Sequence, residues 1–186
     1  MYKEPNVYSS YKKNNIGKTI YDIVLEYKPI KIVEIGVLDA YSTICMAQAI
    51  RDLNNGGLVY AYDLFGHYDY NSSTMKQVVN NAADHRVVQY VTVKMMGLED
   101  LLKTPEEFDL MHLDVSNTGD IIELVYKTVA EWKNTGPILF EGGTEERDQV
   151  DWMIKYDKTP IFPLKDEIGY EILDERFPGL SIIRES

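Results

Sequence analysis

The sequence predicts a three-layer α/β fold: a sandwich of about seven mostly parallel strands, with an antiparallel pair at its C-terminal edge. Three observations lead to this prediction. Short β-rich segments alternate with helical segments, which is typical of βαβ units. Segments such as "DLMHL" and "PILF" are apolar almost throughout, as expected for strands covered on both faces. About fifteen residues without a clear helix separate the last two β-like segments, which favours antiparallel pairing.

The first half of the chain begins with an amphipathic helix. Apolar side chains recur at helical spacing over residues 16–27, and Pro29 then ends the helix. Runs rich in β-branched and aromatic residues follow, and they predict strands at 31–36, 58–63 and 87–95. The segments between these strands predict helices at 42–53 and 73–83.

The second half continues the alternation. We expect a short helix at 98–103, with Pro105 marking its exit, and an amphipathic helix at 119–133. Apolar runs predict strands at 108–115 and 136–143, and a further helix is expected at 145–156. The last two β-like segments are 159–164 and 180–185. We therefore expect one domain over residues 1–186, with residues 1–15 as a polar N-terminal segment.

Composition excludes several classes of function. The net charge is −11, with 30 acidic and 19 basic residues, and no basic stripe is present to neutralise phosphates, so nucleic acid is disfavoured as a partner. The apolar runs are far shorter than the roughly 18 residues that suggest a membrane span, and residues 1–15 do not resemble a secretory signal. Cys45 is the only cysteine, which excludes an internal disulfide and a cysteine-based zinc site. A cytoplasmic protein is expected, and a homo-oligomer is compatible with the sequence.

Acidic residues lie at or near the ends of five consecutive predicted strands. In an open α/β sheet, ligands bind outside the carboxyl ends of the strands, so side chains at these ends are the candidates for a site. The five residues are Glu34, Asp63, Glu99, Asp114 and Glu141. This acidic rim favours a cationic ligand.

The arrangement resembles the class I S-adenosylmethionine-dependent methyltransferases, a Rossmann-like family, from about residue 16 to the C-terminus. The corner Glu34-Ile35-Gly36 matches the acidic-x-Gly fingerprint of that family. The longer stretch "EIGVLDAYST" is most similar to the macrocin-type (methyltransferase 24-like) O-methyltransferases, which often read Glu-Ile-Gly-x-x-x-Gly-Gly-Ser-Thr. Ala40 and Tyr41 replace the paired glycines of that pattern. The resemblance implies O-methylation of a small or medium-sized molecule.

The resemblance also implies which residues bind S-adenosylmethionine. Asp63 would bind the ribose hydroxyls, the turn at Leu98 and Glu99 would flank the adenine, and Asp114 would lie near the methionine part and the acceptor. The full set of cofactor-binding candidates is Glu34, Gly36, Ser42, Thr43, Asp63, Leu98, Glu99 and Asp114.

Several of these candidates also have a structural interpretation. Gly36 fits a tight turn, Asp63 a turn former and Glu99 a first-turn helix acid. Ser42 and Thr43 fit N-capping residues. Glu34 lies in an apolar strand and needs a partner, either the cofactor ammonium or a lysine.

The corner itself helps to choose between cofactors. In dinucleotide sites the later glycines let the backbone approach a pyrophosphate, and the β-carbons of Ala40 and Tyr41 oppose that approach. S-adenosylmethionine carries a sulfonium cation and no phosphate, so an acidic surround suits it. An NAD-dependent oxidoreductase is accordingly the weaker alternative, and a methyltransferase-like binding protein without turnover is a second one.

Removing a proton from an acceptor hydroxyl requires a base or a metal. We consider Asp114, His112 and His67 as the base, in that order, although His112 also fits a buried, hydrogen-bonded role. Loop 64–71, which contains His67, fits either a lid or a core-closing segment. Asp114 and Glu141 are the candidates for a shared Mg²⁺, without the histidine and the second acid of metal-dependent relatives.

Overall fold

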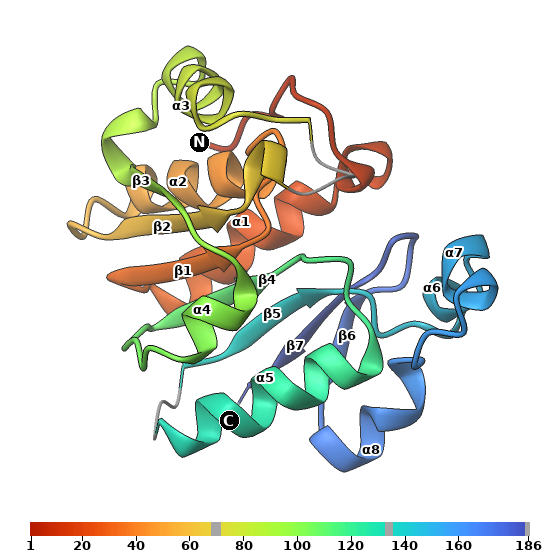
Figure 1. The fold of residues 1–186 in the computed structure, drawn as a ribbon. Coiled ribbons are helices and arrows are strands. Elements are labelled where there is room, and N and C mark those ends of the chain that lie inside the picture. The colour runs from red at the N-terminus through yellow and green to blue at the C-terminus, as the bar shows by residue number, and fades with distance from the viewer. Residues whose placement is uncertain (68–71, 133–135, 185–186) are drawn as a thin grey trace.

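In the computed structural model, which describes residues 1–67, 72–132 and 136–184, seven strands form a single sheet in the order β3-β2-β1-β4-β5-β7-β6. Strands β1 to β5 pair in parallel, whereas β7 is antiparallel to both β5 and β6. Helices cover both faces of the sheet (Figure 1). The predicted three-layer fold with an antiparallel edge is confirmed.

The strands of the sheet are short. Their bounds are β1 Lys31–Ile35, β2 Leu58–Asp63, β3 Val91–Met95, β4 Leu110–Leu113, β5 Ile138–Glu141, β6 Glu171–Asp174 and β7 Leu180–Ile183. The α-helices are α1 Ile16–Tyr27, α2 Tyr41–Leu53, α3 Met75–Asp84, α4 Leu98–Leu102, α5 Gly119–Glu131, α6 Glu145–Asp148, α7 Asp151–Lys155 and α8 Lys165–Ile168. The described residues also form the 3-10 helices η1 Ser10–Asn14, η2 Phe65–His67, η3 Val88–Tyr90 and η4 Phe162–Leu164.

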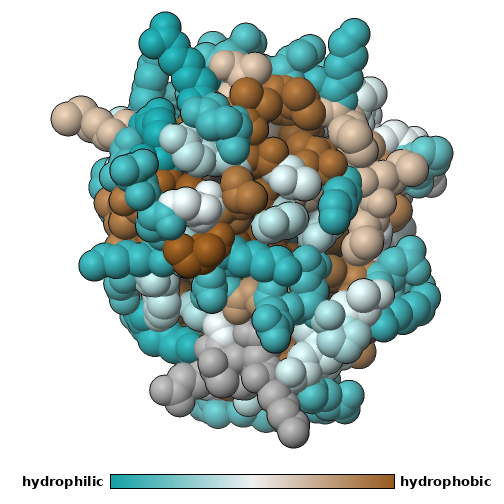
Figure 2. All heavy atoms as spheres, turned by 90° about the vertical axis from the view of Figure 1, so that its left-hand side faces the viewer, coloured by the Kyte–Doolittle hydropathy of each residue, from teal (hydrophilic) through white to brown (hydrophobic). Residues whose placement is uncertain are grey.

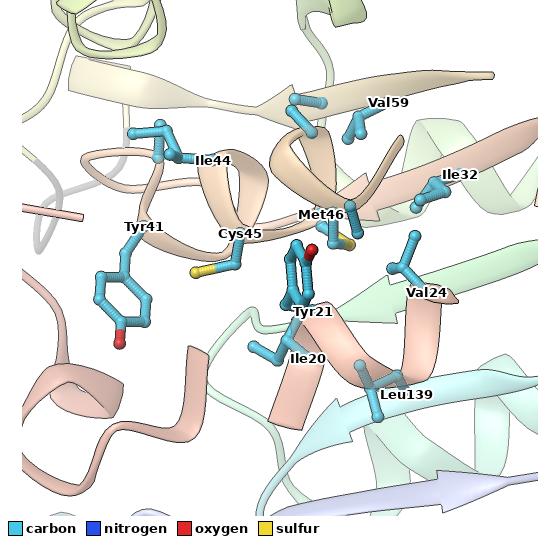
Figure 3. Packing of buried hydrophobic residues seen from close by; sticks show 14 of the residues in the cluster. Ile20, Tyr21, Val24, Ile32, Tyr41, Ile44, Cys45, Met46, Val59 and Leu139 are labelled. Carbon is cyan, nitrogen blue, oxygen red and sulfur yellow. The ribbon is translucent and has the colours of Figure 1, made fainter. Parts of the chain in front are cut away.

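Two hydrophobic clusters lie on the two faces of the sheet. One includes the buried faces of α1 and α2, and Figure 3 shows Ile20 and Val24 of α1 near Met46 of α2 and Ile32 of β1. These four side chains are fully buried. The second cluster contains apolar residues of α5 and the opposite face of the sheet. The sheet is therefore held from both sides, which fixes the positions of its strand ends.

The predicted strand at 159–164 is wrong. Pro160 and Pro163 lack the N–H that a strand must donate, and the segment instead contains η4. The strand that pairs with β7 at the edge of the sheet is β6, which follows α8. The expected edge pair is present, but one of its strands lies later in the chain than predicted.

Two other predicted elements are divided. The helix expected at 145–156 is split into α6 and α7. The Asp148 carboxylate at the end of α6 accepts the backbone N–H groups of Ile161 and Phe162, at 3.0 and 2.7 Å, which ties this helix end to another segment. The strand expected at 87–95 begins as η3 and becomes extended only at Val91.

Figure 2 shows the side of the molecule from which β1 and β2 start in Figure 1. Hydrophobic residues gather in the upper middle of this face, and hydrophilic side chains surround them.

Within the described ranges, the helices lack the combination of length and apolarity that a bilayer crossing requires.

Candidate active site

A cavity of about 830 Å³ lies at the carboxyl ends of the parallel strands. Its walls come from the segments that follow β1 to β5, and Tyr8, Ser9 and Ser10 of the N-terminal segment also line it. The ends of these strands thus meet at one cavity, and four of the five acidic candidates, Asp63, Glu99, Asp114 and Glu141, line it. Of the candidate residues, those in the cavity lining are Gly36, Ser42, Asp63, Leu98, Glu99, Asp114 and Glu141.

Gly36 lets the backbone of the β1–α2 corner approach the end of β4. Its φ is +90°, and a Cβ at this position would lie 1.9 Å from the carbonyl oxygen of Asp114. Ala40, at the position of a glycine in the family pattern, also has a positive φ of 70° and directly precedes α2. The corner therefore keeps a glycine-like backbone at Ala40 although both paired glycines of the pattern are replaced, at a strain of roughly 1–2 kcal/mol.

Asp63 fastens this corner to the end of β2. Its Oδ2 accepts the backbone N–H groups of Val37 and Leu38 at 2.7 and 3.1 Å, and its Oδ1 accepts that of Phe65 at 2.6 Å. Hydrogen bonds of N–H groups to a carboxylate are stronger than those to neutral acceptors. Asp63 thus does form a turn, as one interpretation predicted, and it also stands in the cavity wall with 7% of its surface exposed.

Glu34 is fully buried and lies behind the cavity wall. Its carboxylate accepts hydrogen bonds from Ser42 Oγ and Thr43 Oγ1, each at 2.5 Å, and lies 3.1 Å from His112 Nδ1. This corrects the expectation of a lysine or ammonium partner. It also corrects the N-capping interpretation of Ser42 and Thr43: Ala40 is the N-cap of α2, and both hydroxyls serve Glu34 instead.

His112 is buried between two protein partners. Its Nε2 lies 3.3 Å from the Tyr11 hydroxyl, and its Nδ1 faces Glu34. His112 and Thr43 are both absent from the described lining of the cavity. His112 is therefore not placed as a base that touches substrate, because both of its ring nitrogens face protein groups.

Asp114 and Glu141 form a carboxyl pair at the β4–β5 end of the cavity. Burial and the neighbouring carboxylates of Glu141 and Glu34 raise the pKa of Asp114 well above its usual range, and Arg147 offsets this only in part. Burial and Asp114 likewise raise the pKa of the Tyr11 hydroxyl. Glu141 accepts the Nε–H of Arg147 at 2.8 Å. A line of polar contacts therefore connects Arg147, through the carboxyl pair, to Tyr11, His112 and Glu34.

The donor set at this end does not fit the expected Mg²⁺. Such an ion takes about six oxygen ligands, and Glu141 is already paired with a guanidinium. Among the described residues, no group of three or more histidine, cysteine or acidic side chains is arranged to hold a metal.

The remaining candidates lie on the β2–β3 side. Leu98 and Glu99 begin α4 and line the cavity. His67 ends η2 with an exposed side chain and is not part of the described lining, so its expected role as base has no support from its position. Phe65 of the same loop is buried in the core, whereas the part of the expected lid at 68–71 lies outside the described residues.

The comparisons with known proteins agree with this architecture. A family model described as "Methyltransferase domain" matches residues 33–143, which is more than half of the chain. The chain belongs to this methyltransferase family. The matched range starts in β1 and ends just after β5, so it contains both the Gly36 corner and the carboxyl pair. A search of curated proteins found no match.

Solved structures resemble this chain over almost its whole length. The O-methyltransferase TomG of Streptomyces achromogenes, involved in tomaymycin synthesis and solved with SAM, has a TM-score of 0.66 and 15% identity, covering 98% of this chain and 83% of that one. The SAH-bound methyltransferase PaMTH1 of Podospora anserina has a TM-score of 0.65 and 18% identity, covering 96% and 80%. The Bacillus cereus O-methyltransferase in complex with SAH has a TM-score of 0.62 and 15% identity, covering 98% and 84%. At these identities the likeness establishes the fold.

Sequence reasoning missed two parts of this methyltransferase site. The polar N-terminal segment was given no role in the site, yet Tyr8 lines the cavity and Tyr11 is buried against His112. The recurring tyrosines in this otherwise polar segment were the available signal. Arg147 and Trp152 of the cavity wall were also missed. They lie in a sequence segment rich in charged residues, where no local pattern distinguishes a buried arginine from an exposed one.

Proposed function

We propose that this protein is an S-adenosylmethionine-dependent O-methyltransferase that acts on a small or medium-sized molecule. One observation carries the proposal: in a chain of the methyltransferase family, the cavity at the strand ends has Asp63 beside the Gly36 corner on one side and the pair Asp114 and Glu141 on the other. The solved structures of similar fold that contain SAM or SAH support the choice of cofactor.

The cavity suits a cationic cofactor. Its described lining includes Asp63, Glu99, Asp100, Asp114 and Glu141 but a single basic residue, Arg147. When bound, S-adenosylmethionine supplies a methyl group on a positively charged sulfur for transfer to an acceptor oxygen. An acidic lining attracts that charge, whereas it repels the pyrophosphate of a dinucleotide.

We assign the cofactor contacts by position in the cavity wall. Asp63 binds the ribose hydroxyls, Leu98 and Glu99 flank the adenine, and the backbone at Gly36 and Ser42 faces the methionine part. Gly36 contributes by its close-packed backbone. Glu34 and Thr43 act from behind the wall, since the Glu34 carboxylate accepts hydrogen bonds from hydroxyls at the start of α2.

Asp114 accepts the proton of the acceptor hydroxyl. A base works best when its pKa lies near the working pH, and the raised pKa of Asp114 moves this carboxyl in that direction. Tyr11 and His112 position it from behind, because the Tyr11 hydroxyl interacts with Asp114 on one side and His112 on the other. The cavity walls align the acceptor on binding. The entropic cost of orienting it is then no longer part of the barrier to methyl transfer, which is lower as a result.

Asp63→Ala tests the cofactor assignment. We expect S-adenosylhomocysteine to raise the Tm of the wild type more than NADH does, and to bind the variant at least about tenfold more weakly, because hydrogen bonds to a charged group contribute roughly 1.5–3 kcal/mol each. Thermal shift and calorimetric titration measure both effects.

Asp109→Ala is the matched control. Asp109 also accepts two backbone N–H groups, those of Ile30 and Lys31, both at 2.8 Å, but it does so at the start of β1 and away from the cavity. This variant should lose stability and keep its affinity for S-adenosylhomocysteine. An Asp63 variant with unchanged affinity would remove Asp63 from the site.

A further inference from the structure

Arg147 is the one basic side chain in the described lining of the cavity. It is only 3% exposed, its Nε donates to Glu141 Oε1 at 2.8 Å, and its guanidinium carbon lies 4.9 Å from the centre of the Trp152 ring. Thr144 accepts the Arg147 backbone N–H and caps α6 at this point. The arginine is therefore fixed in position by three separate contacts.

One end of this guanidinium lacks a partner. Of the buried side-chain nitrogen and oxygen atoms in the described part of the chain, Arg147 Nη1 is the one with no hydrogen-bond partner. Buried polar groups in native proteins are nearly always paired, so an exception calls for an explanation. Because the side chain belongs to the cavity wall, an acceptor oxygen on a bound molecule would supply the missing partner.

The charge balance at this end of the cavity favours a single negative charge on that molecule. The Glu141 carboxylate is offset by its ion pair with the Arg147 guanidinium. The local repulsion of an anion is therefore weaker than two acidic side chains suggest. One guanidinium that already serves Glu141 suits a carboxylate better than a phosphate dianion.

Apolar side chains line the same cavity. They are Trp152 of α7 and Ile121 and Leu124 of α5, and Leu124 is 52% exposed. Apolar surface of this kind suits the hydrophobic body of a ligand. The same cavity is lined by these apolar side chains, by Arg147 and by the carboxyl pair of Asp114 and Glu141.

We propose that Arg147 binds a carboxylate of the methyl acceptor, which is a hydroxy acid with an apolar body. This inference rests on the proposed function and adds the class of acceptor to it. Arg147 thereby determines specificity, while Asp114 takes the proton of the acceptor hydroxyl.

The test compares acids with their alcohol counterparts. The 2-, 3- and 4-hydroxybenzoates and the matching hydroxybenzyl alcohols are titrated calorimetrically into the protein saturated with S-adenosylhomocysteine. The variants are Arg147→Lys, which keeps a cation beside Glu141 but loses the second arm of the guanidinium, and the control Arg176→Lys. Arg176 pairs with Asp174 outside the described cavity lining.

We expect at least one hydroxybenzoate to bind the wild type at least tenfold more tightly than its alcohol, and Arg147→Lys to abolish that preference while Arg176→Lys keeps it. Affinity of Arg147→Lys for S-adenosylhomocysteine should be unchanged. If the protein binds S-adenosylhomocysteine but no acid preferentially, or if Arg147→Lys keeps the preference, the inference is wrong and the proposed function stands. Failure of S-adenosylhomocysteine to bind the wild type would overturn both.

Discussion

Asp114→Asn is expected to abolish methyl transfer and, at the same time, to stabilise the protein at neutral and alkaline pH. Loss of a general base lowers a rate by roughly 10²–10⁴-fold. The stability effect follows from the raised pKa of Asp114 in the folded state, which burial and Glu141 cause. Between the ordinary pKa of about 3.9 and the raised value, the folded state binds more protons than the unfolded state, so stability falls as pH rises.

Asparagine removes this titration and the stability loss that accompanies it. The variant and the wild type should therefore be similarly stable near pH 4, and the variant should be more stable above that, by about 1.4 kcal/mol for each unit by which the pKa is raised. Urea unfolding from pH 4 to pH 9 measures the difference.

Asp120→Asn is the control with the opposite sign. A hydrogen bond from the Thr118 hydroxyl lowers the pKa of Asp120, so its contribution to stability is present at neutral pH and is lost on acidification. The Asp120 variant should be slightly less stable at pH 7 and should remain active. An Asp114 variant that is less stable than the wild type at pH 8, or that keeps a tenth of its activity, contradicts the assignment.

Gly36→Ala is expected to have the largest effect on stability. The added Cβ would lie 1.9 Å from the Asp114 carbonyl oxygen, so β1 and β4 could not keep their spacing, and the positive φ of +90° adds strain. Overpacking and left-handed strain together cost at least about 3 kcal/mol. For a chain of this size the Tm should fall by at least about 6 °C.

Gly169→Ala separates the two causes. Gly169 also has a positive φ, +76°, but an added Cβ there meets nothing within 4 Å. Its substitution should cost only the backbone strain, about 1 kcal/mol. Equal losses in the two variants, measured by chemical unfolding, would show that the close approach at Gly36 is not what holds the corner in place.

Elements with a strong local pattern could be predicted from the sequence. The helix at 16–27 and the strand at 58–63 have the predicted bounds, because their apolar spacing is regular and their ends carry turn residues. The segment at 159–164 was mispredicted because its β-branched and aromatic residues outweighed two prolines in the pattern. Helix 145–156 was mispredicted because the tie from Asp148 to residues 161–162 is a tertiary contact.

The site was predictable where position in the sheet determines it and unpredictable where partners do. Asp63 and Asp114 reach the cavity because parallel strands bring their carboxyl ends to one edge. Glu34 also ends such a strand, but its partners come from α2 and from β4, and no local pattern specifies that pairing. Tyr11 contacts His112 although 101 residues separate them in the sequence. Arg147 is buried where it pairs with Glu141 of the carboxyl pair.

A crystal structure of the protein grown with saturating S-adenosylhomocysteine tests the central claim most directly. We predict that the ligand occupies the cavity at the strand ends, with its ribose hydroxyls within hydrogen-bond distance of the Asp63 carboxylate and its sulfur toward Asp114. Crystals in which this cavity contains no S-adenosylhomocysteine, or in which the ligand binds at another face, would contradict the claim.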